Sequence, residues 1–165
     1  MEKRITYAFW GSSNGESWLD WYREVKSLFC EIGHEVNYLG VEFESYNPSK
    51  LVTARRKEKE IVQKMTEGEI PRSLELFSIP DGFRTAIFDH DMYCARTDRY
   101  ICYTLYERDM GEETEKQFIR ITERYFSPER GEAFSTSVND VPLIYISTGK
   151  AGNIRSFELI KTLKF

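Results

Sequence analysis

The sequence predicts a single α+β domain over residues 1–165, built on a mixed or mainly antiparallel sheet. A chain of 165 residues, 41% of them hydrophobic and 15% aromatic, is long enough for one core and too short for two. Short apolar runs of β-type composition alternate with segments whose apolar residues recur at helical spacing. We therefore expect an N-terminal strand-helix-strand unit, a central antiparallel meander, and a C-terminal helix and hairpin.

The N-terminal unit begins with an apolar run at residues 5–10, and a turn-rich segment follows at Gly11–Gly15. The next apolar residues recur at steps of four and three, which predicts a helix that ends at Gly33. They are Trp18, Tyr22, Val25, Phe29 and Ile32. Two pairs could supply the N-terminal cap, either Ser13 with Glu16 or Ser17 with Asp20. Alternation over residues 36–43 then predicts the second strand.

The rest of the chain predicts further elements in order. Residues 49–66 are expected to form a mostly exposed helix, because charged residues fill its middle. The meander is expected from strands at 73–79, 83–93 and 100–107. A third helix is expected over 112–126, an irregular segment with a short helical turn over 127–140, and a hairpin from strands at 141–148 and 154–165 around Gly149–Asn153.

The charge balance narrows the classes of partner. The chain has 23 basic and 27 acidic residues, a net charge of −4, whereas general nucleic-acid binders usually carry a basic excess. Residues 1–48 hold four basic and eight acidic residues, and residues 49–72 hold seven and four. Such polarity suits a protein partner or an anionic ligand. The longest apolar stretches fall short of the roughly twenty residues of a membrane span, and the N-terminus lacks a secretory apolar region, so we expect a cytoplasmic protein.

The three cysteines, Cys30, Cys94 and Cys102, are odd in number and widely spaced. Such spacing is not typical of a disulfide framework or a zinc site. We expect all three to be small core residues. The sequence predicts neither a cofactor nor a bound metal.

The strongest enzymatic candidate is Asp89-His90-Asp91. On a strand, Asp89 and Asp91 would share one face and could hold Mg²⁺ or divide acid and base roles. The simpler interpretation is a polar strand end. His34, the second histidine, follows Gly33 and is expected at a helix terminus, so a triad or a multi-histidine metal site is hard to build.

The Gly11–Gly15 segment was also considered as a phosphate-binding turn, because it lies between a strand and a helix N-terminus. Its spacing matches neither the dinucleotide fingerprint nor the P-loop, which favours a plain connecting turn. The segment Gly149–Gly152 lies between two expected strands and is interpreted as a hairpin turn.

Aromatic residues are dense in the first helix. Trp21 is about 100° round the helix from Tyr22, so it could be partly exposed beside Asp20 and Glu24. An exposed aromatic with a charged rim is typical of a protein-binding hot spot. The alternative is that Trp21 widens the buried stripe.

The run Tyr7-Ala8-Phe9-Trp10-Gly11, with the serine-containing loop and the aromatic helix after it, resembles the start of bacterial immunity proteins that neutralise polymorphic toxins. The similarity is to the immunity protein 52 family and covers about the first quarter of the chain. It implies a small, non-enzymatic cytoplasmic protein that binds one toxin domain and blocks its active site or substrate path.

The sequence therefore favours an immunity or inhibitor protein whose partner is a cognate toxin or effector domain. Many such toxins act on nucleic acids through basic clefts, which an acidic surface complements. The candidate contacts are Glu16, Asp20, Trp21, Glu24, Glu42 and Glu44. Two alternatives stay open: an anion- or metal-dependent enzyme or ligand-binding domain that uses Gly11–Gly15 and the Asp89/Asp91 pair, and a phage or mobile-element inhibitor of a host defence protein. The oligomeric state is left open.

Overall fold

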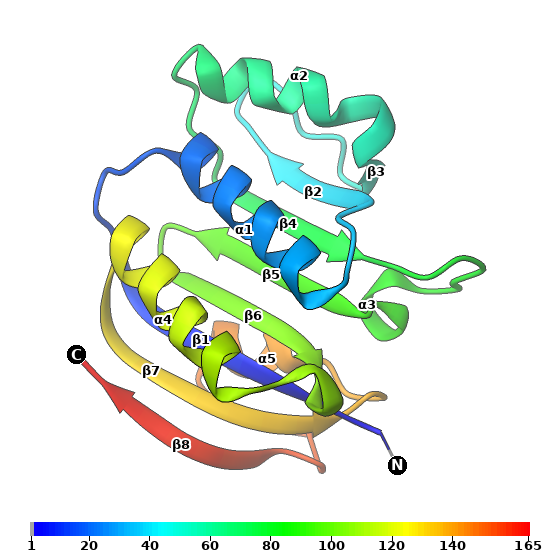
Figure 1. The fold of residues 1–165 in the computed structure, drawn as a ribbon, viewed down its shortest axis with the longest axis vertical. Coiled ribbons are helices and arrows are strands. Elements are labelled where there is room, and N and C mark those ends of the chain that lie inside the picture. The colour runs from blue at the N-terminus through cyan, green and yellow to red at the C-terminus, as the bar shows by residue number, and fades with distance from the viewer. Residues whose placement is uncertain (1) are drawn as a thin grey trace.

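A single antiparallel sheet organises the computed structural model, which describes residues 2–165 (Figure 1). Its strands are β1 Lys3–Ser13, β2 Tyr38–Glu42, β3 Val52–Thr53, β4 Ser73–Ser78, β5 Met92–Thr97, β6 Tyr100–Tyr106, β7 Phe126–Ser137 and β8 Glu158–Lys164. Their order across the sheet is β3-β2-β4-β5-β6-β1-β7-β8, and each neighbouring pair is antiparallel. The N-terminal strand therefore lies inside the sheet, paired with two strands that come much later in the chain.

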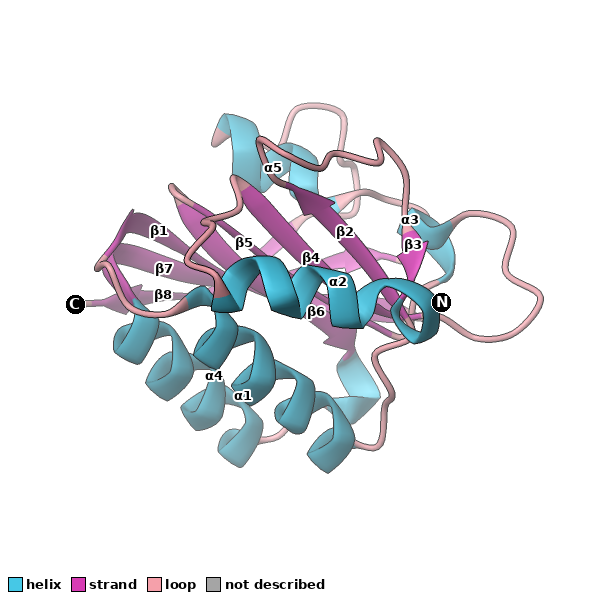
Figure 2. Ribbon diagram, turned by 90° about the horizontal axis from the view of Figure 1, so that it is seen from above, coloured by secondary structure: helices cyan, strands magenta, loops and turns pink. Residues whose placement is uncertain are grey.

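The helices cover the two faces of the sheet unequally. The longer helices are α1 Trp18–Ile32, α2 Ala54–Thr66 and α4 Glu112–Tyr125, and their buried residues belong to the larger core on one face. The shorter elements are α3 Ala86–Asp89, α5 Pro142–Thr148 and the 3₁₀ turn η1 Glu107–Asp109. Figure 2 shows α1 and α4 side by side against one face and α5 on the opposite face. The sheet is thus sandwiched between a thick helical layer and a thin one.

The two cores follow from the alternation of side chains along each strand. In β1, Tyr7 and Phe9 point toward the larger core under α1 and α4, whereas Ala8 belongs to the smaller core under α5. The larger core is strongly aromatic: Tyr103 stacks on Phe118 with ring centroids 4.3 Å apart. Both faces of the sheet are apolar, which explains why the strands have short, continuous apolar runs.

The predicted α+β class, the mainly antiparallel sheet and the N-terminal strand-helix-strand unit are confirmed. The first helix begins where one of the two predicted caps lies: the Ser17 hydroxyl accepts a hydrogen bond from the Asp20 backbone N–H at 3.1 Å. It ends at Gly33, which has a left-handed φ of 103°. The predicted stripe is buried, except for the partly buried Ile32.

Three predicted elements in the second half are wrong. Residues 83–91 form a loop with α3 rather than the start of a strand, because Asp89 accepts hydrogen bonds from two backbone amides and closes a helical turn. Residues 141–148 form α5 rather than a strand: Pro142 occupies its first turn and Gly149 ends it with a φ of 72°. Most of the segment 127–140, which was expected to be irregular, belongs to the strand β7. The strand β8 pairs with β7 rather than with residues 141–148, its predicted hairpin partner.

Two of the three cysteines, Cys94 and Cys102, are buried as predicted. Cys30 is exposed, which corrects the expectation that it is a core residue. It lies on the solvent side of α1, next in sequence to the buried Phe29. Within residues 2–165, the helices are too short or too polar to cross a membrane.

Candidate functional site: an acidic groove

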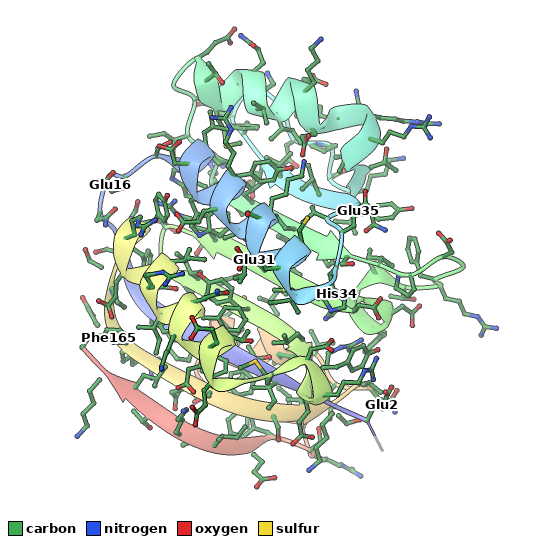
Figure 3. All side chains as sticks on the ribbon, in the orientation of Figure 1. Glu2, Glu16, Glu31, His34, Glu35 and Phe165 are labelled. Atoms are coloured by element: carbon green, nitrogen blue, oxygen red, sulfur yellow. The ribbon has the colours of Figure 1, made fainter. Side chains whose placement is uncertain are left out.

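A groove of about 430 Å³ lies where α1 begins, α2 ends and the β5–β6 turn projects. We call it the acidic groove. Its lining residues are Ser13, Gly15, Glu16, Ser17, Trp18, Leu19, Met65, Gly68, Glu69, Ile70, Pro71 and Asp98. Figure 1 shows these segments at the same end of the molecule, and Figure 3 places Glu16 there, with Glu31, His34 and Glu35 at the other end of α1.

One wall of the groove is the loop between β1 and α1. The Asn14 side chain holds this loop, because its Oδ1 accepts from the Glu16 N–H at 3.1 Å and its Nδ2 donates to the Arg124 carbonyl, also at 3.1 Å. Gly15 turns the chain with a left-handed φ of 83°, a conformation that favours glycine. Glu16 is therefore exposed on a loop that hydrogen bonds of the Asn14 side chain hold in place.

The opposite wall is the connection from α2 to β4. Gly68 ends α2 with a left-handed φ of 91°. The Glu69 carboxylate accepts hydrogen bonds from the Ser45 hydroxyl at 2.5 Å and the Ser45 N–H at 3.2 Å, and the hydroxyl bond above all lowers the pKa of Glu69. Ile70 follows with 71% of its surface exposed, the most exposed large hydrophobic side chain in residues 2–165. The wall thus presents an ionised carboxylate next to an uncovered apolar side chain.

Arg96 supports the floor of the groove from below. Its guanidinium is buried 4.2 Å from the Trp18 ring centroid and 5.6 Å from that of Trp21. Its Nη2 donates to the Ser13 hydroxyl at 3.1 Å and the Tyr125 carbonyl at 3.0 Å. Burial lowers the pKa of Arg96 to about 10, so the group still carries its charge at pH 7. This side chain ties the end of β1, the start of α1 and the end of α4 together.

The residues that line the groove carry negative charge. It includes the three carboxylates of Glu16, Glu69 and Asp98, and none of the lining residues in the described chain is Lys or Arg. The Lys64 ammonium group, which is not part of the lining, lies 4.0 Å from the Glu69 carboxylate and donates to the Ser45 hydroxyl at 3.1 Å. The other lining side chains are largely apolar. A concave, negatively charged surface attracts cationic groups, and exposed apolar side chains within it favour a partner with apolar contacts of its own.

The structure brings some of the predicted contact residues to this groove. Glu16 lines it, and Asp20 is exposed one turn further along α1. Glu42 and Glu44 adjoin the second wall: the Glu42 carbonyl accepts from the Arg72 N–H at 2.7 Å, its carboxylate lies 3.7 Å from the Arg72 guanidinium, and the exposed Glu44 precedes Ser45.

Two predicted contact residues lie elsewhere. Trp21 is fully buried, so the expectation of an exposed aromatic anchor is wrong, and the alternative of a wider buried stripe is correct. The reason is that α1 packs against both the sheet and α4, which buries a broad sector of the helix. Glu24 faces α4, where it pairs with Arg124 at 2.7 Å and accepts from the Tyr125 hydroxyl at 2.6 Å.

The Gly11–Gly15 segment, for which phosphate binding was the less favoured interpretation, begins inside the sheet and ends in the loop before α1. Residues 11–13 belong to β1, and a Cβ atom on Gly11 would lie 2.1 Å from the Ser127 carbonyl oxygen. Gly11 therefore permits the close approach of β7. The helix N-terminus beyond it faces carboxylates, which disfavours an anion.

The Asp89/Asp91 pair does not share a strand face. Asp89 ends α3 and accepts from the Arg84 and Thr85 amides at 2.7 and 2.9 Å, and these bonds, the Thr85 one first, lower its pKa. Asp91 lies half-buried in the following bend, where its N–H donates to the Ser78 carbonyl at 2.8 Å. Within residues 2–165, His, Cys, Asp and Glu side chains form no group of three or more that could hold a metal ion.

Neither histidine lines the acidic groove. His34 follows the α1 terminus as predicted, and its Nε2 lies 3.1 Å from the Asp109 carboxylate. His90 is buried on the other face of the sheet.

Three lining residues, Glu69, Ile70 and Asp98, were not predicted from the sequence. An isoleucine between Gly68-Glu69 and Pro71 is an apolar residue within turn chemistry, which is a weak local signal of exposure. Asp98 lines the same groove as Ile70 because of the order of the strands in the sheet, and no local sequence pattern encodes that order.

No protein-family model matches this chain, and no curated protein matches its sequence, so membership of the immunity protein 52 family stays a prediction. A comparison of structures finds similarity to a crystal structure of the toxic C-terminal tip of CdiA from Pseudomonas aeruginosa in complex with immune protein. The identity is 12%, the similarity covers 85% of this chain and 90% of that chain, and the TM-score is 0.39. A similarity of this extent does not establish a shared fold or a shared function.

Proposed function

We propose that this protein is a small, non-enzymatic cytoplasmic inhibitor that binds a basic surface of a toxin or effector domain through the acidic groove and so blocks its active site. The observation that carries the proposal is the combination of the three carboxylates with the exposed Ile70. Carboxylates would steer a basic partner and fix its orientation, and the apolar side chain would supply buried contact area.

The groove is suited to rigid recognition. Both walls are held by side chain to backbone hydrogen bonds, and Arg96 braces the loop that carries Glu16. A pre-organised surface loses little conformational entropy on binding, which favours tight inhibition. Residues that the enzymatic alternative would use have other roles: Gly11 lies in the pairing of β1 with β7, and Asp89 closes a helical turn.

The proposal is tested by co-expression with the toxin or effector domain that co-purifies with this protein. Cells that produce the toxin domain should grow when the wild-type protein is present. A variant with Glu16→Lys, Glu69→Lys and Asp98→Lys should fail to protect them. A matched variant, Glu35→Lys, Glu107→Lys and Glu113→Lys, changes the net charge equally but at exposed sites outside the groove, and it should protect fully. Lack of protection by the wild-type protein would refute the proposal.

A further inference from the structure

A second concave site lies on the other face of the sheet, between the strands and the thin layer of α3 and α5. It is an apolar cavity of about 190 Å³. Its lining includes the polar residues Glu75, His90 and Tyr93 and, from α5, the apolar residues Leu143 and Ile146. An engineered cavity of about 150 Å³ holds benzene, so this space suits a single ring with a short substituent.

Glu75 is the acidic group of the cavity. Its register partner is Gly40 in β2, and a Cβ atom on Gly40 would lie 2.7 Å from Glu75 Oε1, so the glycine leaves room for the carboxyl group. The Tyr93 hydroxyl donates to Oε2 at 2.6 Å. Burial raises the pKa of Glu75, and the Tyr93 bond opposes this. Within residues 2–165, Oε1 has no hydrogen-bond partner, so it is the free acceptor of a carboxyl group that lines the cavity.

His90 supplies a second acceptor. Its Nδ1 lies 2.9 Å from the Ala86 carbonyl oxygen, so Nδ1 carries the proton and Nε2 is the acceptor in the neutral ring. The residue is 3% exposed, and within residues 2–165 its Nε2 has no hydrogen-bond partner. The Arg4 guanidinium donates to the His90 carbonyl at 2.8 Å and fixes this segment. A buried acceptor without a partner is costly, so a donor at this position would stabilise the protein.

Both acceptors adjoin one aromatic residue. The Tyr93 hydroxyl bonds Glu75, and the Tyr93 and His90 ring centroids lie 5.6 Å apart. We propose that the cavity binds a small amine whose body is a single ring or a short hydrocarbon and whose N–H groups donate to Glu75 and His90. The apolar lining would hold the body, and the carboxylate would favour a cation over a neutral molecule of the same shape. This site is separate from the acidic groove and independent of the proposed inhibitor function.

The test uses the full chain and three probes of similar shape: benzylamine, benzyl alcohol and toluene. Isotope-edited NMR titrations should show saturable binding of benzylamine, with the chemical-shift changes centred on the cavity. Intermolecular nuclear Overhauser effects should connect its ring with the methyl groups of Leu143 and Ile146 in the wild-type protein. Absence of these effects at millimolar benzylamine would overturn the proposal.

Two conservative variants show whether Glu75 selects the amine. Glu75→Gln should weaken benzylamine at least about tenfold and change the binding of benzyl alcohol and toluene little, because it removes the charge and keeps the shape. Glu132→Gln is the matched control: Glu132 is also a half-buried carboxylate that accepts from a tyrosine, Tyr145, at 2.7 Å, but it lies outside the cavity lining. Equal effects of the two variants, or equal affinity of the wild-type protein for benzylamine and benzyl alcohol, would contradict the assignment.

Discussion

Arg96 is a fully buried cation whose hydrogen bonds go to a hydroxyl and to backbone carbonyls rather than to a carboxylate. Burial of a charge is expensive, and here the compensation comes from the Trp18 ring and from the hydrogen bonds of Nη2, while Nε and Nη1 are buried without a hydrogen-bond partner among residues 2–165. A guanidinium can stack on an aromatic ring and donate hydrogen bonds at the same time, because it is planar and carries its donors at its edge. The residue thus couples the stability of the core to the geometry of the acidic groove.

Arg96→Lys should lower the free energy of unfolding by about 2 kcal/mol, because an ammonium ion keeps the charge and loses both the planar stacking and part of the hydrogen bonding. Urea denaturation followed by tryptophan fluorescence measures the change. The matched control is Arg99→Lys at an exposed turn position, which should stay within about 0.5 kcal/mol of the wild-type value. Equal effects of the two substitutions would contradict the role of Arg96.

His90 makes stability depend on pH. Burial and the nearby Arg4 guanidinium lower the pKa of His90 to about 4, while its bond to the Ala86 carbonyl and the charge of Asp89 act in the opposite direction. The unfolded chain, with a histidine pKa near 6.5, binds a proton more readily than the folded one between these values. His90 therefore contributes stability above about pH 6.5 that is lost progressively as the pH falls toward 4.

His90→Asn should remove this contribution, because the asparagine amide can take the place of Nδ1 and does not titrate. From pH 7 to pH 4, the wild-type protein should lose about 2–3 kcal/mol more unfolding free energy than the variant. Urea denaturation at several pH values gives the two curves. Parallel curves would show that His90 is not the group responsible.

Among the elements, α1 and α4 were predictable because each buries a stripe of residues such as Phe29 or Phe118 at helical spacing, and α1 also has clear signals at both ends. The helix α5 was missed although Pro142 and Gly149 marked its ends, because its β-branched residues favoured a strand. The strand β7 was missed for another reason. Its first half, Phe126–Arg130, is polar and contains a proline, and it becomes a strand through pairing with β1.

The pairing of β1 with β7 also explains Gly11. The register shifts between Trp10 and Gly11, and this irregularity brings the Ser127 carbonyl against the glycine. Gly11 does not have a left-handed φ. A glycine is required here because a side chain would not fit beside the Ser127 backbone.

Gly11→Ala should therefore destabilise the protein by about 2 kcal/mol or more, since the added methyl group must displace backbone atoms. Gly111→Ala is the control, because a Cβ atom there meets open space, and its effect should stay within about 1 kcal/mol. Thermal unfolding by circular dichroism measures both. A Gly11 variant as stable as the control would show that β7 can move away from residue 11 without loss of stability.

At the scale of the whole molecule, the sheet separates two concave sites of different chemistry. The acidic groove opens at one end of the helical layer, and the apolar cavity lies under α5 on the other face. The acidic character of the first third was predictable from composition, and so was the position of Glu16 at a helix start. The site as a whole was not, because Glu69 and Asp98 join Glu16 through the strand order of the complete sheet.

The central claim is that the acidic groove binds the basic surface of a partner that this protein inhibits. Isothermal titration with the toxin or effector domain that co-purifies with this protein tests it most directly, using the wild-type protein, the Glu16/Glu69/Asp98→Lys variant and the Glu35/Glu107/Glu113→Lys control. We expect the groove variant to bind at least about 100-fold more weakly than the wild-type protein and the control to bind within a few fold of it. Equal affinity of the groove variant and the control would contradict the claim.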